Sequence, residues 1–201
     1  MQDVQKVLDT LNARPNIIVF GVGHSGTTVL ARIINTLGWN IKGPRTSVDT
    51  THWECANMVE VNAAYLGEIQ DGKRTDRCEP GSAEFREGDA RYIFKHLPKP
   101  WVVKDPRLVW CFDQWLRVFE DTLEELPLMV YLTRNSAALA RSYSKEGQPA
   151  HTQMLLEEQV RAQRVFDEYE GPKFHLEFEA IVTAAARVKL NVDNLERLNS
   201  L

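Results

Sequence analysis

The feature that most constrains the fold is a glycine-rich loop between a buried strand and a helix. Residues 16–20 form an apolar run without polar alternation, which is typical of a strand covered on both faces. The loop Gly21-Val-Gly-His-Ser-Gly-Thr-Thr28 follows, and residues 27–37 have helical apolar spacing that ends at Gly38. Such a loop lets backbone N–H groups curl around an anion, which the helix N-terminus also attracts. The alternative interpretation is an ordinary glycine-rich turn.

Further strands alternate with helices along the chain. We expect strands at residues 101–104, 128–133 and 174–178, and helices at 4–11, 53–66, 108–123, 136–144, 152–169 and from Ile181 onward. This alternation predicts an α/β fold of three layers, of the P-loop type, with a mostly parallel central sheet flanked by helices. Residues 1–201 are expected to form a single domain, with the polar residues 67–100 as an insertion or lid.

Composition excludes several classes of protein. The 201 residues include 24 Lys and Arg against 28 Asp and Glu, so a net charge of -4 argues against nucleic-acid binding. No run approaches the roughly 18–20 apolar residues of a membrane span, and the N-terminus lacks a signal-peptide core. Three cysteines without a C-x-x-C pair and five scattered histidines predict neither a disulfide framework nor a metal site. A cytoplasmic location without membrane contact is the simplest prediction.

The loop differs from that of an ATP- or GTP-using enzyme in one residue. Gly21 and Gly26 have the G-x-x-x-x-G spacing of a phosphate loop, but Thr27 stands where such a loop has Lys. Phosphoryl transfer depends on that cation, so a kinase or NTPase is disfavoured. The loop suits a 5′-phosphate whose distal group is not held by lysine and magnesium.

The same segment resembles the loop of the PAPS-dependent sulfotransferases, in particular the bacterial and carbohydrate-type members. PAPS is 3′-phosphoadenosine 5′-phosphosulfate, and the family binds its 5′ end with the pattern [K/R]-S-G-T-[T/S]. Here the stretch is His24-Ser25-Gly26-Thr27-Thr28. His24 departs from the pattern, since a neutral imidazole donates one hydrogen bond but has no permanent charge. The resemblance implies that these five residues bind the phosphosulfate.

A second segment agrees with this resemblance. In the family, an Arg at a strand end and a Ser eight residues later bind the 3′-phosphate, and Arg134 and Ser142 have that spacing. A planar guanidinium can make paired charge-assisted bonds to a phosphate, and a hydroxyl adds a neutral one. Arg141 has the right residue type but not the spacing. Without the glycine loop, the pair would be interpreted as a surface Arg and a helix Ser.

A third segment, Trp101-Val-Val-Lys104-Asp105-Pro106-Arg107-Leu108, resembles the K-D-P-R-L element of the bacterial and Golgi-type carbohydrate sulfotransferases. A Lys at the carboxyl end of a central strand lies where ligands bind in open α/β sheets. The resemblance implies that Lys104 neutralises charge on the transferred group, with help from Arg107. Alternatively, Asp105 and Arg107 only pair to hold the turn. Phe94-Lys-His96 resembles a Lys-x-His strand motif of the family, but no buried strand run precedes it.

Sulfuryl transfer also needs a general base to take the proton of the acceptor. The segment His52-Trp53-Glu54 is similar to H-W-E stretches of bacterial sulfotransferase-like proteins. We expect Glu54 to be the base, with His52 as the second candidate. The alternative is that Glu54 is an ordinary carboxylate in the first turn of a helix.

Together these segments predict a sulfotransferase-like domain that moves a sulfuryl group from PAPS to an acceptor hydroxyl or amine and releases PAP. The acceptor is expected to be a carbohydrate or a small metabolite, and no metal is required. One alternative is a P-loop nucleotide or metabolite kinase, and another is a catalytically silent nucleotide-binding protein of the same fold. The sequence shows no basic glycine-containing loop near residue 201 of the kind that covers the adenosine in many members.

Overall fold

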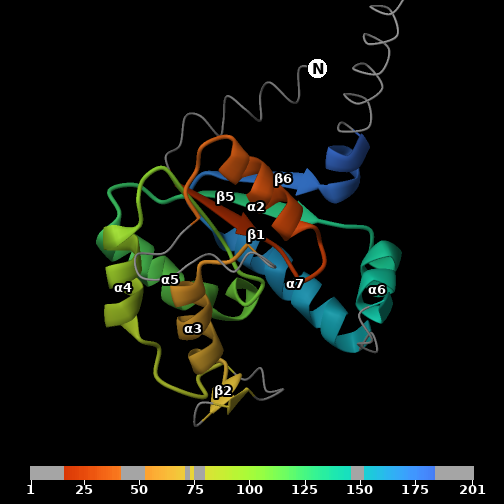
Figure 1. Ribbon diagram of the computed structural model, residues 1–201. Helices are drawn as coiled ribbons and strands as arrows, with labels where there is room; N and C mark the ends of the chain where they lie inside the picture. Colours follow the sequence, from red (N-terminus) through yellow and green to blue (C-terminus); the bar gives the residue numbers. More distant parts are fainter. Residues whose placement is uncertain (1–15, 42–52, 71–72, 75–79, 146–151, 184–201) are drawn as a thin grey trace, which may run out of the picture.

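The computed structural model describes residues 16–41, 53–70, 73–74, 80–145 and 152–183. Its main sheet consists of β1 (Asn16–Phe20), β4 (Trp101–Lys104), β5 (Leu128–Thr133) and β6 (Lys173–Glu177). The strand order is β4-β1-β5-β6, and every neighbouring pair is parallel. The expected α/β class, with a parallel sheet flanked by helices, is therefore confirmed (Figure 1).

Apart from α4 (Glu87–His96), which was not predicted, the helices begin and end close to the predicted residues. They are α2 (Thr27–Thr36), α3 (Ala56–Tyr65), α4 (Glu87–His96), α5 (Leu108–Thr122), α6 (Ser136–Lys145) and α7 (Thr152–Glu168). A short antiparallel hairpin of β2 (Ile69–Gln70) and β3 (Lys73–Arg74) follows α3. The helix predicted from residue 53 begins later, at Ala56, because Trp53 has a left-handed φ of 57°. The helix predicted at residues 4–11 lies outside the described residues.

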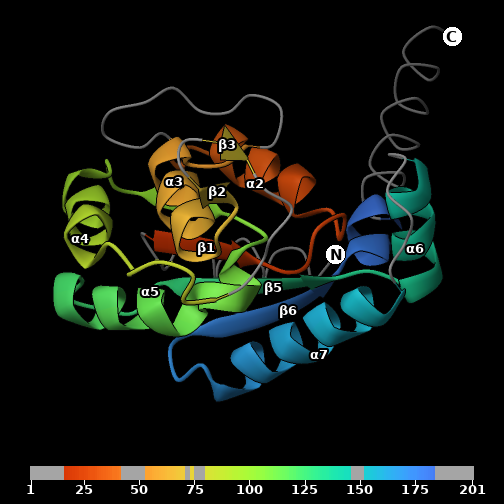
Figure 2. The same cartoon turned by 90° about the horizontal axis from the view of Figure 1, so that it is seen from below.

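Alternating side chains of the strands divide the core into two halves. Ile17 and Val19 of β1 pack with α2, whereas Ile18 and Phe20 pack with residues of α3, α4, α5, α6 and α7. Figure 2 shows α2 and α7 on opposite sides of the sheet. Because both faces are covered, β1 has no polar side chain after Asn16, which explains its continuous apolar sequence.

The segment expected to be a polar insertion or lid, residues 67–100, is in part core. Helix α4 buries Ala90, Ile93 and Phe94. The Phe94 ring centroid lies 5.0 Å from that of Trp101 and 4.9 Å from that of Phe119. An apolar stripe of helical spacing is present here within a polar segment, so the average composition of the segment did not predict the helix. The structure also shows that Phe94-Lys-His96 is helical and forms no strand motif.

The topology brings three loops to one edge of the sheet. Val19 is in register with Lys104, and Phe20 is in register with Tyr131, so β1, β4 and β5 end side by side. The chain passes from β1 to a neighbour on one side and then to a neighbour on the other, so the strand order reverses at β1. Ligands of open α/β sheets bind at the carboxyl ends of the strands beside such a reversal. None of the helices within the described ranges is long and apolar enough to cross a membrane.

Candidate functional site

The loop after β1 has a backbone conformation that few residues other than glycine adopt. His24 has a φ of 60° and Gly26 a φ of 97°. Ser25 is buried, and its hydroxyl donates to the carbonyl of Val22 at 2.7 Å, which closes the loop on itself. A Cβ atom on Gly26 would overlap the ring of Phe178. The loop is therefore shaped by an internal hydrogen bond and by one close contact with the segment after β6.

Arg134 and Ser142 both reach this loop. The Arg134 guanidinium donates from Nη1 to the carbonyl of His24 at 3.0 Å and lies 4.8 Å from the ring centroid of Phe178. The Ser142 hydroxyl lies 3.3 Å from Nδ1 of His24. The Nε atom of Arg134 is buried and has no hydrogen-bond partner among the described residues. The two residues predicted from their spacing thus meet at the loop, and the guanidinium retains a donor there.

The other predicted loop residues begin helix α2. Thr27 is buried and Thr28 is half-buried. The helix begins directly after Gly26, and the first N–H groups of a helix have no partner within it. The positive end of the helix dipole is consequently located at the loop.

A hollow of about 390 Å³ lies beside Arg134 at the start of α6. It is lined by Thr133, Arg134, Asn135, Ser136, Glu177 and Glu179. The side chain of Asn135 accepts from the N–H groups of Ala137 and Ala138, and its backbone N–H donates to Glu179 at 3.2 Å. The N-terminus of α6 is therefore already capped by groups of this chain.

A second cluster of charges lies at the carboxyl end of β4. Lys104 donates from Nζ to Glu54 Oε1 at 2.6 Å, and the side chains are only 4% and 9% exposed. Arg107 lies 3.5 Å from Glu54, 3.0 Å from Asp105 and 2.8 Å from Glu68. The predicted base and the predicted cation are thus each other's partners. Asp105 and Arg107 do pair across the turn, but Arg107 also contacts Glu54 and Glu68, so the turn is not its only partner.

Asn62 of α3 is hydrogen-bonded to this cluster and to two side chains of α5. Its amide group donates to Asp105 Oδ2 at 2.8 Å. Its amide oxygen accepts from the indole of Trp115 at 2.6 Å and from the thiol of Cys111 at 3.2 Å. Sequence reasoning missed Asn62, and the available signal was its position one helical turn after Met58, on the buried face of α3.

The carboxylates of this cluster outnumber its cations. Burial raises the pKa of Glu54, and the nearby Asp105 adds to the effect, whereas Lys104 and Arg107 lower it. Burial lowers the pKa of Arg107, but Asp105 and Glu68 outweigh this and raise it above its ordinary value. Two cations face three carboxylates here, so this β4-end cluster offers no surplus positive charge.

Of the two candidates for the general base, Glu54 lies within the described residues. Glu54 precedes α3, whose N-cap is Cys55, so it is not a carboxylate of the first helical turn. His52, the second candidate for the base, lies outside the described residues. Trp53 between them is 5.3 Å from the guanidinium of Arg32 on α2.

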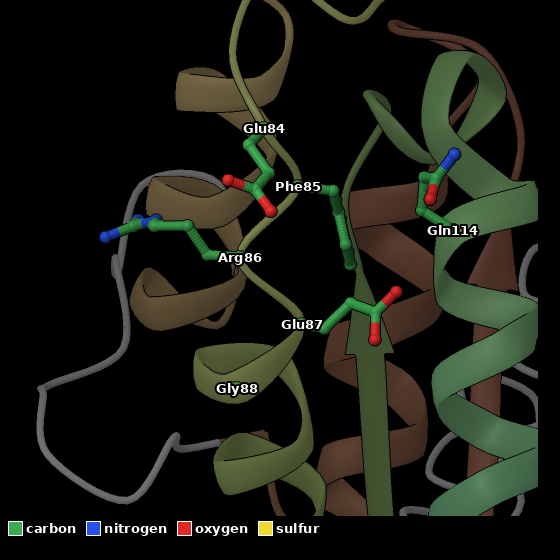
Figure 3. A pocket seen from close by; sticks show the side chains of 6 residues that line it. All are labelled: Glu84, Phe85, Arg86, Glu87, Gly88 and Gln114. Atoms are coloured by element: carbon green, nitrogen blue, oxygen red, sulfur yellow. The ribbon is translucent and has the colours of Figure 1, made fainter.

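A further hollow, of about 590 Å³, lies apart from these clusters. It is lined by Glu84, Phe85, Arg86, Glu87, Gly88 and Gln114. Figure 3 shows Gln114 on the facing helix α5 and the Arg86 side chain pointing away from it. None of the residues that the sequence singles out lines this hollow, and its carboxylates do not suit an anionic ligand.

Comparisons with protein-family models, with curated proteins and with solved structures find no match to this chain. The described part of the chain contains no group of three or more His, Cys, Asp or Glu that could hold a metal ion.

Proposed function

We propose that this chain is a PAPS-dependent sulfotransferase, with a fold of the P-loop type, that acts on a hydroxyl or amine of a carbohydrate or small metabolite. The observation that carries the proposal is the convergence of Arg134 and Ser142 on the loop at His24. The two side chains come from a segment more than a hundred residues later in the chain. Their meeting with the loop is what a ligand with phosphates at both ends requires.

The residues present fit such a ligand. The loop after β1, the start of α2 and the His24 imidazole would hold the 5′ end, and Ser25 would keep the loop closed. Arg134, with its Nε donor without a partner among the described residues, would hold the 3′-phosphate together with Ser142. Burying a guanidinium donor without a partner is unfavourable, so an anionic group at this place would stabilise the arrangement.

The chemistry assigns roles to the β4-end cluster. PAPS supplies the sulfuryl group: the acceptor oxygen or nitrogen forms its bond to sulfur while the bond from sulfur to the phosphate oxygen breaks. Glu54 would accept the acceptor's proton, and its raised pKa makes it a stronger base than an exposed carboxylate. Lys104 would release Glu54 and stabilise the negative charge that develops on the transferred group.

The proposal is tested by calorimetric titration with PAP and with ATP, each with and without magnesium. We expect PAP to bind without magnesium and Arg134→Ala to weaken it roughly 10- to 100-fold, the value of a charge-assisted hydrogen bond of about 1.5–3 kcal/mol. Arg141→Ala is the matched control, since this exposed Arg of α6 has the same charge. Preference for Mg-ATP, with indifference to Arg134, would overturn the proposal in favour of a kinase.

A catalytically silent binding protein is the second candidate, and one observation favours it. Lys104 is already engaged by Glu54 at 2.6 Å in a buried pair, so both groups must exchange partners for turnover. Incubation with radiolabelled PAPS and a panel of sugars and amines distinguishes the two. Label transfer that is lost in Glu54→Gln, with PAP binding retained, supports the enzyme, whereas PAP binding without transfer to any acceptor supports the silent protein.

A further inference from the structure

A tyrosine of α6 links the loop to helix α7. Tyr143 is buried, and its ring centroid lies 4.0 Å from that of His24. A Cβ atom on Gly23 would lie 2.7 Å from its hydroxyl oxygen. Two residues of the loop therefore pack on one aromatic side chain, and Gly23 is needed for this close approach.

The hydroxyl end of Tyr143 is held from α7. Glu158 accepts a hydrogen bond from the indole N–H of Trp110 at 3.4 Å. Burial raises the pKa of this carboxyl, and its interactions with Trp110 and Tyr143 lower it. Arg161, one turn further along α7, donates to the carbonyl of Val109 at 2.8 Å and lies over the Trp110 ring at 5.1 Å. These contacts fix α7 on α5 and with it the position of the Glu158 carboxylate.

The position of His24 needs such support. A left-handed φ is sterically disfavoured for a non-glycine residue, and His24 has a φ of 60°. The contacts that hold it there include the Arg134 guanidinium on its carbonyl, the Ser142 hydroxyl on its Nδ1 and the Tyr143 ring on its imidazole. The contact with Tyr143 differs from the other two, because Arg134 and Ser142 are proposed to bind the ligand.

We infer that Tyr143 and Glu158 are positioning residues, which hold the His24 imidazole and the loop backbone in the conformation that binds an anionic phosphate or phosphosulfate group. This inference rests on the proposed function of the loop. It adds a path of direct contacts from α7 through Glu158, Tyr143 and His24 to the ligand. Neither positioning residue touches the ligand itself.

The first test uses the protein without ligand. The ring current of Tyr143 should shift the NMR resonances of the His24 ring protons. These resonances are assigned by their disappearance in a His24→Gln variant. Tyr143→Leu should abolish this shift, and Tyr143→Phe and Glu158→Gln should change it. Tyr92→Leu is the matched control, because the Tyr92 ring stacks on His96 at 4.1 Å in α4 and should affect His96 alone. His24 resonances that stay unchanged in all three variants would overturn the inference.

The second test measures PAP affinity in the same variants. Tyr143→Phe and Glu158→Gln should each weaken PAP binding roughly 2- to 10-fold, the value of one ordinary hydrogen bond. Both substitutions preserve side-chain size, so folding should be retained even if Tyr143→Leu unfolds. Equal PAP affinity in wild type, Tyr143→Phe and Glu158→Gln would reject the positioning role and leave the proposed function intact. If wild type binds no PAP, the proposed function fails, and with it the part of the inference that concerns the ligand.

Discussion

The loop cluster around His24 and the β4-end cluster around Lys104 lie at the same edge of the sheet but differ in the groups that their cations contact. In the loop cluster, the Arg134 guanidinium contacts a carbonyl and an aromatic ring. At the end of β4, Lys104 and Arg107 face carboxylates at distances of 2.6 to 3.5 Å. A cation without a carboxylate partner can attract an anionic ligand, whereas a paired cation first has to leave its partner.

The difference suggests a division of labour. The loop cluster has the donors for binding. In the β4-end cluster the charges are paired with one another, within a network that also joins α3 to the sheet. Substitutions in the first cluster should therefore act mainly on affinity, and substitutions in the second mainly on stability. The following variants test that division.

The largest effect is expected for Lys104→Met. The substitution leaves Glu54 buried beside Asp105 without its closest cation, so the free energy of unfolding should fall by about 3–5 kcal/mol. Urea unfolding measures the change. The double variant Lys104→Met with Glu54→Gln should recover most of it, because no unpaired charge remains. An unchanged urea midpoint in the single variant would show that the pair contributes nothing.

Asn62→Leu should have the next largest effect. Leucine has a similar volume but leaves the Trp115 indole and the Asp105 carboxylate short of one partner each in a buried site, at a cost of about 2–4 kcal/mol. Thermal and urea unfolding report the loss. A change below about 0.5 kcal/mol, typical of surface substitutions, would contradict the supporting role of Asn62.

Gly26→Ala should act on both stability and binding. Its Cβ atom overlaps the Phe178 ring at a φ of 97°, so we expect a loss of about 1–3 kcal/mol in unfolding free energy. PAP binding should weaken roughly tenfold, about 1.4 kcal/mol. Gly38→Ala is the control, because Gly38 also has a positive φ, of 113°, with open space around it. If both variants bind PAP equally well, the loop shape is not needed for binding.

Ser142→Ala should affect binding alone. Losing one neutral hydrogen bond, worth about 0.5–1.5 kcal/mol, should weaken PAP roughly 2- to 10-fold and leave the unfolding free energy almost unchanged. Calorimetry and urea unfolding on the same preparation measure the two quantities. A loss of stability without a loss of affinity would move Ser142 from the binding role to a structural one.

The smallest effect concerns pH. Burial raises the pKa of Glu54 above its ordinary 4.5, so the contribution of this group to stability is complete below pH 4.5 and declines as pH rises through the folded-state pKa. Compared with the double variant Lys104→Met with Glu54→Gln, wild type should therefore gain stability as pH falls from 7 towards 4.5. A difference that grows in the opposite direction would mean that Lys104 dominates over burial.

Local patterns predicted the parts of the fold that local physics decides. The apolar runs at residues 16–20 and 128–133 are β1 and β5. The eight-residue spacing singled out Arg134 and Ser142 as a pair, but only the structure shows that both contact His24 of the loop. Helix α4 was missed because three buried side chains, at helical spacing, are diluted by charged neighbours. Glu68 was missed because nothing in its neighbourhood indicates a partner 39 residues away.

The strand, loop and helix that surround Gly26 follow from the local sequence, since these depend on residue types within a few positions of one another. Which cation faces a carboxylate, and which faces none among the described residues, depends instead on the tertiary structure. Lys104 meets Glu54 across 50 residues of chain, whereas Arg134 meets a backbone carbonyl across 110. The free energy of a charge depends on its burial and on the charges around it, and both are set by packing between distant segments.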